Sequence, residues 1–308
     1  MITYNHEDYI REAIEGVMIQ NTNFSLELII ADDTSPDHTE EIVASFSNHP
    51  KYSYIKYFKH DVNKGMMNNF IWALQQAKGQ YVALCEGDDY WTDPNKLQKQ
   101  VDFLESNPEY SMCFHQGTSI YQNSKKEENS ISDKMILNGI VTNNEIIRLG
   151  GSLCPTNSIV YRNLHTEFPP FFYEVKSGDR ALALLLMLEG KFKFLNENLS
   201  VYRIHDGGIS RNLDTSQLIG FKDSNITLLE KFNEYSNFKF NKNIKNEISS
   251  QVRNIFIYNP KYVLKLDYLK KIKIKHLFLA FARIFINLFK YFPLILKHQE
   301  KKKLTPNV

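Results

Sequence analysis

Short apolar runs alternate with segments of helical periodicity along the first hundred residues of the chain. A short, continuous, β-prone run indicates a strand, and apolar residues that recur every three or four positions indicate a helix. These patterns predict strands ending at Thr3 and over 26–31, 52–58, 80–85 and 110–121. They predict helices over 8–20, 37–47, 64–77 and 95–106. Such alternation implies an α/β fold with a mainly parallel, Rossmann-like sheet flanked by helices.

The remainder of the chain changes from mixed to helical patterning. Residues 122–139 are polar and charged and are interpreted as a surface loop. Thr142 and Glu145 form a capping box for a short helix that ends at Gly150-Gly151. The later patterns predict a buried helix over 178–190, strands near 192–195 and 199–204, and helices from about 213 onward. We therefore expect two regions, 1–212 and 213–308.

Composition limits the class of protein. A chain of 308 residues that is 43% apolar can bury the core of one large or two modest domains. Its three cysteines form no CxxC pair, which argues against a disulfide framework and against a thiolate zinc site. The opening residues carry no basic and apolar leader pattern, so we expect a cytoplasmic location. The first strand is short, and either the true start lies upstream or the fold tolerates a stunted strand.

The richest chemistry follows the apolar run 80–85, where Glu86-Gly87-Asp88-Asp89 brings three carboxylates together. Acidic residues at the carboxyl end of a sheet strand occupy the edge where open α/β folds bind ligands. Carboxylates so close together repel one another unless a cation lies between them, and oxygen ligands suit Mg²⁺ or Mn²⁺. The turn is therefore interpreted as a metal–diphosphate site. The alternative is an acidic turn that caps the helix after Asp93.

Two further loops are predicted to reach the same edge of the sheet. Thr3-Tyr4-Asn5 follows the first strand, and Asp32-Asp33 follows the second. A tyrosine ring offers a face on which a base can stack, and an aspartate can accept a hydrogen bond from a base N–H. Alternatively, Tyr4 is a core aromatic and the two aspartates form a turn with a helix cap. The coincidence of three such loops favours a nucleotide site.

These motifs, together with Asn63-Lys64-Gly65 and Asp89-Tyr90-Trp91, resemble those of the family 2 glycosyltransferases, which have the GT-A fold. The resemblance covers residues 1 to about 212, with the motifs in family order. It implies that Tyr4 and one of Asp32 and Asp33 hold the nucleotide base, usually uracil, that Glu86 contacts the ribose and that Asp88 binds the metal. The donor-binding set implied by the resemblance is Thr3, Tyr4, Asn5, Asp32, Asp33, Asn63, Gly65 and Glu86. The first acid of the DxD-like motif is a glutamate here.

Two later segments extend the resemblance. Ser177-Gly178-Asp179-Arg180 is similar to the family's acceptor-site motif, which implies that Asp179 is the general base. The alternative is that Asp179 merely suits the positive end of a helix. His205, before Gly207-Gly208, is implied to close the metal or diphosphate site, although a lone histidine is more often structural. Asp89, Trp91 and Arg180 complete the expected acceptor contacts.

The charge of the chain is strongly segregated. Residues 261–308 carry twelve Lys/Arg and two acids, for a net charge of +10, whereas residues 1–260 have a net charge of −8. Residues 277–296 are nearly all apolar, with His276, Arg283 and Lys290 on one helical face. This basic amphipathic segment, 270–303, favours contact with an anionic membrane surface over a spanning helix. The alternatives are packing on the catalytic domain or, from charge alone, a nucleic-acid partner, which we do not expect.

Together these features predict an inverting, metal-dependent glycosyltransferase. It would move a sugar from a nucleotide-diphosphate sugar, expected to be a UDP-sugar, to a hydroxyl of a glycan or lipid-linked acceptor in bacterial cell-surface polysaccharide synthesis. We expect it on the inner face of the cell membrane as a peripheral protein. A nucleotidyltransferase is less favoured, because the loop after the first strand has no glycine. A non-catalytic, membrane-associated sugar-nucleotide binder is the third hypothesis.

Overall fold

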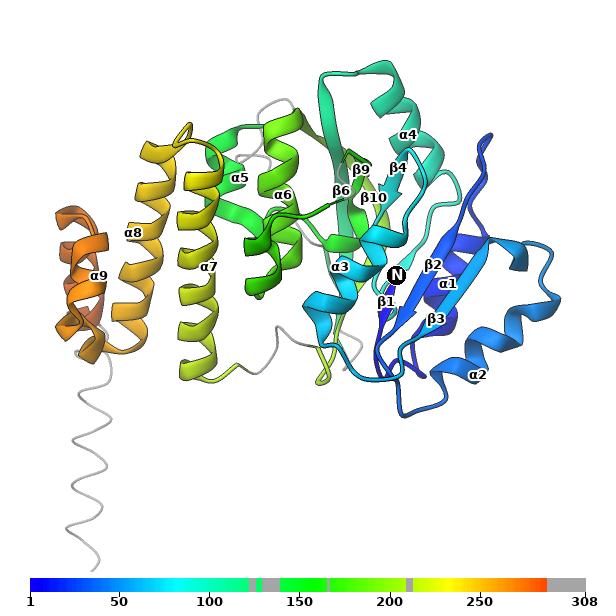
Figure 1. Cartoon of the computed structure of the whole chain (residues 1–308), viewed down its shortest axis with the longest axis horizontal. Coiled ribbons are helices and arrows are strands. Elements are labelled where there is room, and N and C mark those ends of the chain that lie inside the picture. Colours follow the sequence, from blue (N-terminus) through cyan, green and yellow to red (C-terminus); the bar gives the residue numbers. More distant parts are fainter. Residues whose placement is uncertain (122–125, 129–138, 165–166, 209–212, 287–308) are drawn as a thin grey trace, which may run out of the picture. The chain divides into compact units, whose positions relative to one another are not determined.

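The computed structural model describes residues 1–121, 126–128, 139–164, 167–208 and 213–286 (Figure 1). The chain divides into two compact units, Met1–Asn212 and Leu213–Val308. The first unit contains two β-sheets and their covering helices, and the second is helical.

The first sheet of the N-terminal unit is a small parallel sheet. Its strands are β1 (Ile2–Thr3), β2 (Leu28–Asp32) and β3 (Ile55–Lys59), in the order β1-β2-β3. Every residue of β2 is buried, as expected for the central strand of a covered parallel sheet. The connections are α1 (Ile10–Met18), α2 (Thr39–Ala44) with two 3₁₀ turns (Ser45–Asn48 and Tyr52–Tyr54), and α3 (Met66–Gln76) after β3.

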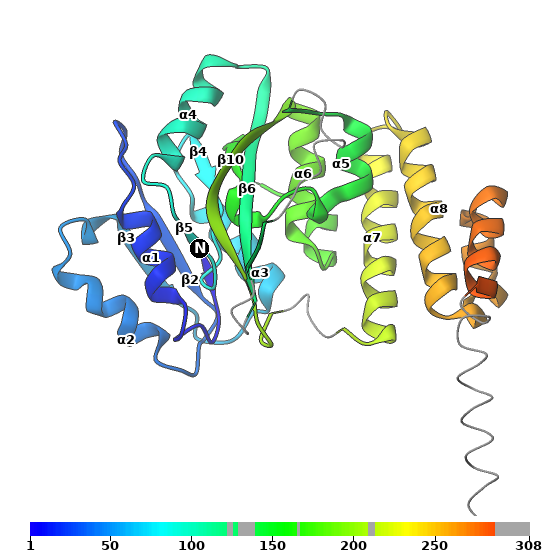
Figure 2. The ribbon, with the colours of Figure 1, turned by 180° about the vertical axis from the view of Figure 1, so that it is seen from behind.

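The second sheet is mixed and has seven strands. Its main order is β4 (Tyr81–Ala83), β9 (Val160–Arg162), β6 (Tyr110–Tyr121), β10 (Lys191–Ile204) and β5 (Tyr90–Trp91). β7 (Lys126–Glu128) pairs with β6, and β8 (Ile140–Val141) pairs with β10. Among the described strands of this sheet, only β6 and β10 run parallel to each other. The long pair β6 and β10 forms the spine of this sheet (Figure 2).

Helices cover this sheet and complete the core. α4 (Lys96–Ser106) and α6 (Gly178–Glu189) both pack against β6. The predicted capping box of Thr142 and Glu145 is present at α5 (Asn143–Leu149). Short 3₁₀ turns occupy Gly150–Ser152, Thr156–Ser158 and Pro170–Glu174. The apolar run of α6 is almost entirely buried, in agreement with its sequence pattern.

A cavity of about 790 Å³ lies beside the short strand β1. Its walls come from β2, α3, β4 and α4, and they are mostly apolar. The Met1 ammonium donates to the carbonyl of Ile29 at 2.8 Å, and burial lowers its pKa. Of the residues predicted to form the functional site, only Glu86 and Trp91 line this cavity. Asp88, Asp179 and His205 are not among the residues that line it.

The C-terminal unit is built on two long helices. α7 (Thr215–Tyr235) begins with a capping box between Asp214 and Gln217, and it packs beside α8 (Asn241–Tyr258) (Figures 1 and 2). A 3₁₀ turn (Pro260–Leu264), α9 (Leu266–Lys271) and a helix from residue 274 to the last described residue, 286, follow. None of the described helices combines the length and the apolar character needed to cross a bilayer.

The predicted α/β fold class is confirmed, with several differences in detail. Part of the predicted loop 122–139 is strand β7, and residues 122–125 and 129–138 lie outside the described residues. The two strands predicted near 192–195 and 199–204 are one strand, β10, whose register shifts between Leu195 and Ser200. The strands β5, β8 and β9 were missed because two or three residues carry too little periodicity. Of the predicted segment 277–296, residues 287–296 lie outside the described part.

Candidate active site

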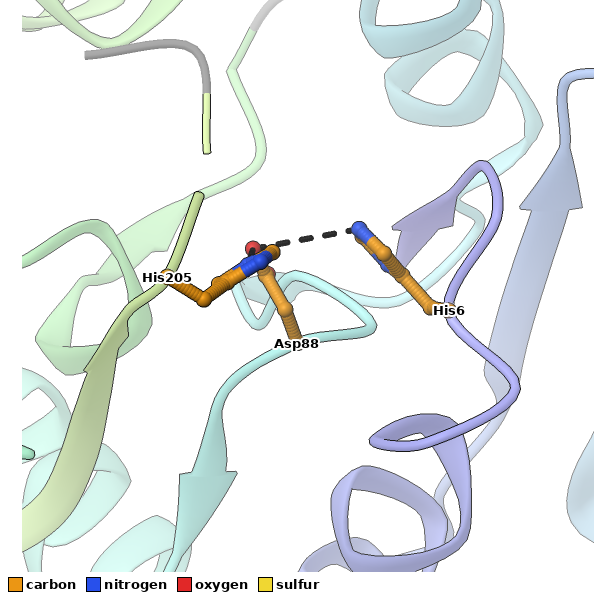
Figure 3. Close-up of side chains that lie close together, drawn as sticks. All are labelled: His6, Asp88 and His205. Carbon is orange, nitrogen blue, oxygen red and sulfur yellow. Dashed lines mark hydrogen bonds and ion pairs between the residues drawn. The ribbon is translucent and has the colours of Figure 1, made fainter. Parts of the chain in front are cut away.

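Three loops from both sheets bring His6, Asp88 and His205 together (Figure 3). His6 follows β1, Asp88 lies in the turn after β4, and His205 follows β10. The Asp88 carboxylate lies between the two imidazole rings, 3.1 Å from Nε2 of His205 and 3.8 Å from Nε2 of His6. One potential ligand atom from each residue lies within 4.8 Å of the other two. This geometry suits a shared cation, with one carboxylate and two imidazoles as ligands.

Close packing of the turn sets this arrangement. A Cβ atom on Gly87 would lie 2.8 Å from Thr3 Oγ1 and 2.9 Å from His6 Nδ1, so a larger residue would push both side chains away. Burial lowers the pKa of His6 despite the opposing charge of Asp88. A neutral imidazole can bind a metal without first losing a proton. Because Gly87 has no side chain, the His6 imidazole can lie against the acidic turn, and burial favours its neutral form there.

Arg203 of strand β10 forms hydrogen bonds with the acidic turn, residues 86–89. Its backbone N–H donates to Asp89 Oδ1 at 2.8 Å, and its guanidinium donates to the carbonyl oxygen of Asp88 at 2.7 Å. The guanidinium also pairs with Glu12 of α1 and lies over the Tyr90 ring at 4.5 Å. One residue, through its backbone and its side chain, thus links the acidic turn to the strand that precedes His205. Asp89 is buried, and burial together with the charge of Asp88 raises its pKa well above the ordinary range.

Glu86 and Thr3 present polar atoms without partners next to the cation site. Among the described residues, Glu86 Oε2 and Thr3 Oγ1 are buried and have no hydrogen-bond partner. Burial, with the nearby charges of Asp88 and Asp179, raises the pKa of Glu86 to about 8. For Asp88, the hydrogen bond from His205 and the charge of His6 outweigh burial and lower its pKa. Buried polar atoms without partners indicate groups that a ligand can satisfy.

The loop after β2 is organised by its two aspartates in different ways. Asp32 accepts from the Ser35 N–H at 2.7 Å and from the Tyr57 hydroxyl at 2.7 Å, and burial followed by this hydrogen bond raises the pKa of Tyr57. Asp33 Oδ1 accepts from the Lys64 N–H at 2.7 Å. Both oxygens of Asp32 are therefore engaged within the protein, whereas Asp33 links the loop to the segment before α3.

The other predicted donor residues surround this loop. Asn63 donates to the carbonyl of Asp33 at 2.9 Å and accepts from the Gly65 N–H at 3.0 Å. Gly65 has a φ of 80°, a conformation that favours glycine, and it leads into α3. Tyr4 is 49% exposed. The Asn5 N–H donates to Ser35 Oγ at 3.0 Å, which ties the first loop to the second.

Asp179 stands in the first turn of α6 against a pair of glycines. A Cβ atom on Gly151 would lie 2.4 Å from Asp179 Oδ2, and one on Gly150 would lie 2.6 Å from the Arg180 side chain. Burial raises the pKa of Asp179, although the N–H and the charge of Arg180 oppose this shift. Since the helix terminus alone would lower the pKa, burial decides the direction. Arg180 is itself buried and donates to the carbonyl of Ile147 at 2.8 Å.

Trp91 lies in the core behind the acidic turn. Its indole N–H donates to the carbonyl of Asn157 at 2.8 Å, and the Lys96 ammonium lies 4.2 Å from the ring centroid. Asn157 in turn donates to the carbonyl of Val201 in β10 at 2.7 Å. Burial lowers the pKa of Lys96 to about 7. Trp91 therefore supports the turn from within, and it is 4% exposed.

Two residues of this arrangement were missed in the sequence, His6 and Arg203. His6 directly follows Thr3-Tyr4-Asn5, so its position after the first strand was a usable signal for a ligand. Arg203 stands two residues before His205, and nothing local distinguishes it from an ordinary strand residue. Its role depends on the pairing of β10 with β5.

Known proteins were compared with the chain by sequence. A family model described as "Glycosyl transferase family 2" matches residues 1–167. An uncharacterized protein of Mycobacterium tuberculosis is 37% identical over 215 residues, which are 68% of this chain and 58% of that protein. The chain thus spans less than two thirds of that relative. The Escherichia coli UDP-Glc:alpha-D-GlcNAc-diphosphoundecaprenol beta-1,3-glucosyltransferase WfgD is 30% identical over 215 residues, covering 69% of this chain and 78% of WfgD.

Solved structures share the fold at low sequence identity. TarS of S. aureus, crystallised in complex with UDP, matches with a TM-score of 0.58 and 17% identity over 89% of this chain and 74% of that chain. The mannosyltransferase PcManGT of Pyrobaculum calidifontis, in complex with GDP-Man and Mn²⁺, matches with a TM-score of 0.54 and 13% identity over 97% and 82% of the two chains. The fold, the motifs and the family model agree, and the chain belongs to glycosyl transferase family 2.

Proposed function

We propose that the chain is an inverting, metal-dependent glycosyltransferase that moves a sugar from a UDP-sugar to a hydroxyl of a glycan or lipid-linked acceptor. The observation that carries the proposal is the placement of Asp88 between His6 and His205 at the ends of strands from both sheets. Loops that converge at the carboxyl ends of sheet strands form the usual ligand crevice of α/β folds. Catalysis is assigned to residues 1–212.

The ligand set favours Mn²⁺ over Mg²⁺. Carboxylates suit either ion, but imidazole is a poorer ligand for Mg²⁺, and two of the three candidate ligands here are imidazoles. When bound, the ion supplies positive charge that stabilises the diphosphate as it leaves. Asp88, His6 and His205 hold it. The Mn²⁺-bound mannosyltransferase with the same fold supports a divalent ion of this kind.

The donor is assigned to the loops after β1, β2 and β4. The exposed ring of Tyr4 stacks on the base, and Asp33 accepts from a base N–H because both oxygens of Asp32 are already engaged. Glu86 and Thr3, each with a buried polar atom that has no hydrogen-bond partner in the described part of the chain, meet the ribose. Asp32, Asn5, Asn63 and Gly65 hold these loops in place. A uridine donor is supported by the UDP complex of TarS and by the UDP-Glc in the name of WfgD.

Asp179 is proposed to act as the general base. Its carboxylate takes the proton of the acceptor hydroxyl as the oxygen forms a bond to the anomeric carbon. The bond from that carbon to the diphosphate oxygen breaks in the same displacement, so the anomeric configuration inverts. The raised pKa of Asp179 strengthens it as a base. Arg180 and Asp89, both buried, support the acceptor side by positioning Asp179 and the turn.

The acceptor and the cellular role follow from relatives. WfgD acts on a diphosphoundecaprenol-linked sugar, which supports a lipid-linked acceptor for this chain. A place in bacterial cell-surface polysaccharide synthesis is proposed on the same ground. The net charge of +10 in residues 261–308 supports attachment at the cytoplasmic face of the membrane. The described helices of residues 213–286 would then hold the enzyme at the membrane.

A panel of sugar nucleotides tests the proposal. The full-length protein is incubated with Mn²⁺, each sugar nucleotide and a diphosphoundecaprenol-linked sugar, and release of nucleoside diphosphate and sugar transfer are measured. Asp179→Asn should lower transfer by about 10²–10⁴-fold and leave donor affinity unchanged, because the amide cannot accept the proton. Asp102→Asn, a change at an exposed carboxylate of α4 that accepts from Gln98, is the matched control. Transfer by Asp179→Asn within about tenfold of wild type would exclude Asp179 as the base.

Adding nucleoside triphosphates to the panel, with pyrophosphate release and donor binding also measured, separates the alternatives. Pyrophosphate release from a nucleoside triphosphate, without sugar transfer, would indicate a nucleotidyltransferase. Donor binding without turnover of any sugar nucleotide would indicate a non-catalytic binder. Either outcome contradicts the proposed transfer.

A further inference from the structure

The C-terminal unit exposes large apolar side chains over a short stretch that follows α8. Leu264 is 86% exposed, Ile274 is 75% exposed and Phe278 is 70% exposed. Leu266 and Phe281 are also largely exposed. Single exposed apolar residues are ordinary, but several within about twenty residues mark a surface that meets an apolar partner. We name residues 261–286 the interfacial segment.

Polar contacts fix the interfacial segment to α7 and α8. The Tyr268 hydroxyl donates to Asp223 of α7 at 2.6 Å, and Lys271 pairs with Glu230 of α7 at 2.7 Å. These two contacts hold α9. The apolar side chains of α9 are therefore exposed on a helix that is anchored to α7.

A buried serine of α8 fixes the start of the next helix. The Ser249 hydroxyl accepts from the Lys273 N–H at 2.7 Å and shares a hydrogen bond of 2.7 Å with His276 Nδ1. His276, which the sequence pattern placed on the polar stripe of this helix, is thus turned toward α8. The rotation of the helix about its own axis follows from this contact.

That rotation leaves an apolar stripe facing outward. Ala280 is fully buried and marks the packed side of the helix. Ile274, Phe278 and Phe281 follow one another at spacings of four and three, so they lie on one face of the helix, and all three are exposed. The helix therefore has an apolar face that packs on its own unit and a second apolar face that meets solvent.

The segment that carries this stripe is rich in positive charge. The interfacial segment contains six lysines and Arg283 against a single acid, Asp267. Lys261, Lys265, Lys270, Lys273 and Lys275 are exposed. An apolar face flanked by lysines is the pattern of a helix that lies in the plane of a membrane interface. An apolar protein partner would not require this excess of one charge.

We propose that the interfacial segment docks on an anionic lipid bilayer, with Ile274, Phe278 and Phe281 inserted among the acyl chains and the lysines on the headgroups. Its purpose rests on the proposed function, because docking would bring the enzyme to a lipid-linked acceptor. The binding itself needs neither donor nor metal. Failure of lipid binding and failure of sugar transfer are therefore distinguishable.

Co-sedimentation of the full-length protein with vesicles tests the inserted stripe. Vesicles of phosphatidylcholine with about one third phosphatidylglycerol should bind the protein, and pure phosphatidylcholine should bind it at least about tenfold more weakly. The double variant Phe278→Ser/Phe281→Ser should lose about tenfold or more in affinity, since both side chains are exposed and their loss leaves the fold intact. Leu164→Ser, at an exposed apolar residue of the first unit, is the matched control and should bind like wild type.

A second pair of variants tests the charge. Lys270→Glu/Lys275→Glu should weaken binding to the anionic vesicles, whereas Lys242→Glu/Lys245→Glu, at exposed lysines of α8, should have a much smaller effect. Wild-type binding should also weaken as salt rises. No binding of wild type to the anionic vesicles would overturn the proposal, as would equal binding by the phenylalanine variant. A wild-type dimer in solution that the phenylalanine variant abolishes would show that the stripe is a contact between copies, which also overturns it.

Discussion

Replacing His6 by alanine tests whether this histidine is a metal ligand. Its side chain is largely buried, its Nδ1 has no partner among the described residues, and its contact with Asp88 is as long as 3.8 Å. Removing it breaks no strong hydrogen bond, but the loss of a buried ring leaves a cavity, so the free energy of unfolding should fall by about 1–3 kcal/mol. The readout that tests the assignment is therefore metal affinity, measured at a temperature where both proteins are folded. Loss of a group that only supports a ligand weakens metal binding by about 10–100-fold, and loss of a ligand should cost at least as much.

The full-length protein is titrated with Mn²⁺ in the presence of UDP, and the heat of binding is measured by calorimetry. We expect His6→Ala to raise the Kd by about 10–100-fold, equivalent to about 1.4–2.8 kcal/mol. His38→Ala is the matched control, because His38 is 79% exposed and only approaches Glu41 at 3.6 Å. An unchanged Kd for His6→Ala, or an equal loss in His38→Ala, would refute the assignment of His6.

Three further predictions concern Asp88, Asp179 and Arg203. Asp88→Asn should abolish Mn²⁺-dependent release of UDP while the Tm stays near that of wild type; full activity would exclude Asp88 as a ligand. Because burial raises the pKa of Asp179 above 3.8, the transfer rate should fall on acidification at a pH above that value, and an acid limb at or below 3.8 would contradict the base assignment. Arg203→Gln should lower the Tm by about 3–10 °C, since it removes a charged hydrogen bond to the Asp88 carbonyl. Arg11→Gln, at an exposed arginine, is its control in the same thermal scan.

Much of the fold could be predicted because the signals are local. The capping box at Thr142 and the apolar run of α6 each depend on residues within a few positions of one another. The order of strands and helices in the first hundred residues followed from the same periodicity. Strands of two or three residues, such as β5 and β9, escaped because their pairing partners lie far away in the sequence. Long-range pairing also decided that the second sheet is mixed.

The candidate active site could also be predicted only in part from the sequence. The sequence alone placed Asp88, Glu86 and Asp179 at the ends of predicted elements, because motif spacing is a property of the chain. The resemblance implied that His205 joins Asp88, but only the tertiary structure brought these residues, 117 positions apart, to 3.1 Å and placed His6 beside them. The tertiary structure also determines which carboxyl groups are buried, and burial raises the pKa of Glu86 and of Asp179. The physical reason is that residue type and spacing can be read directly from the sequence. Burial, the distance between charges and ligand geometry depend instead on residues that are far apart in the sequence and that only folding brings into contact.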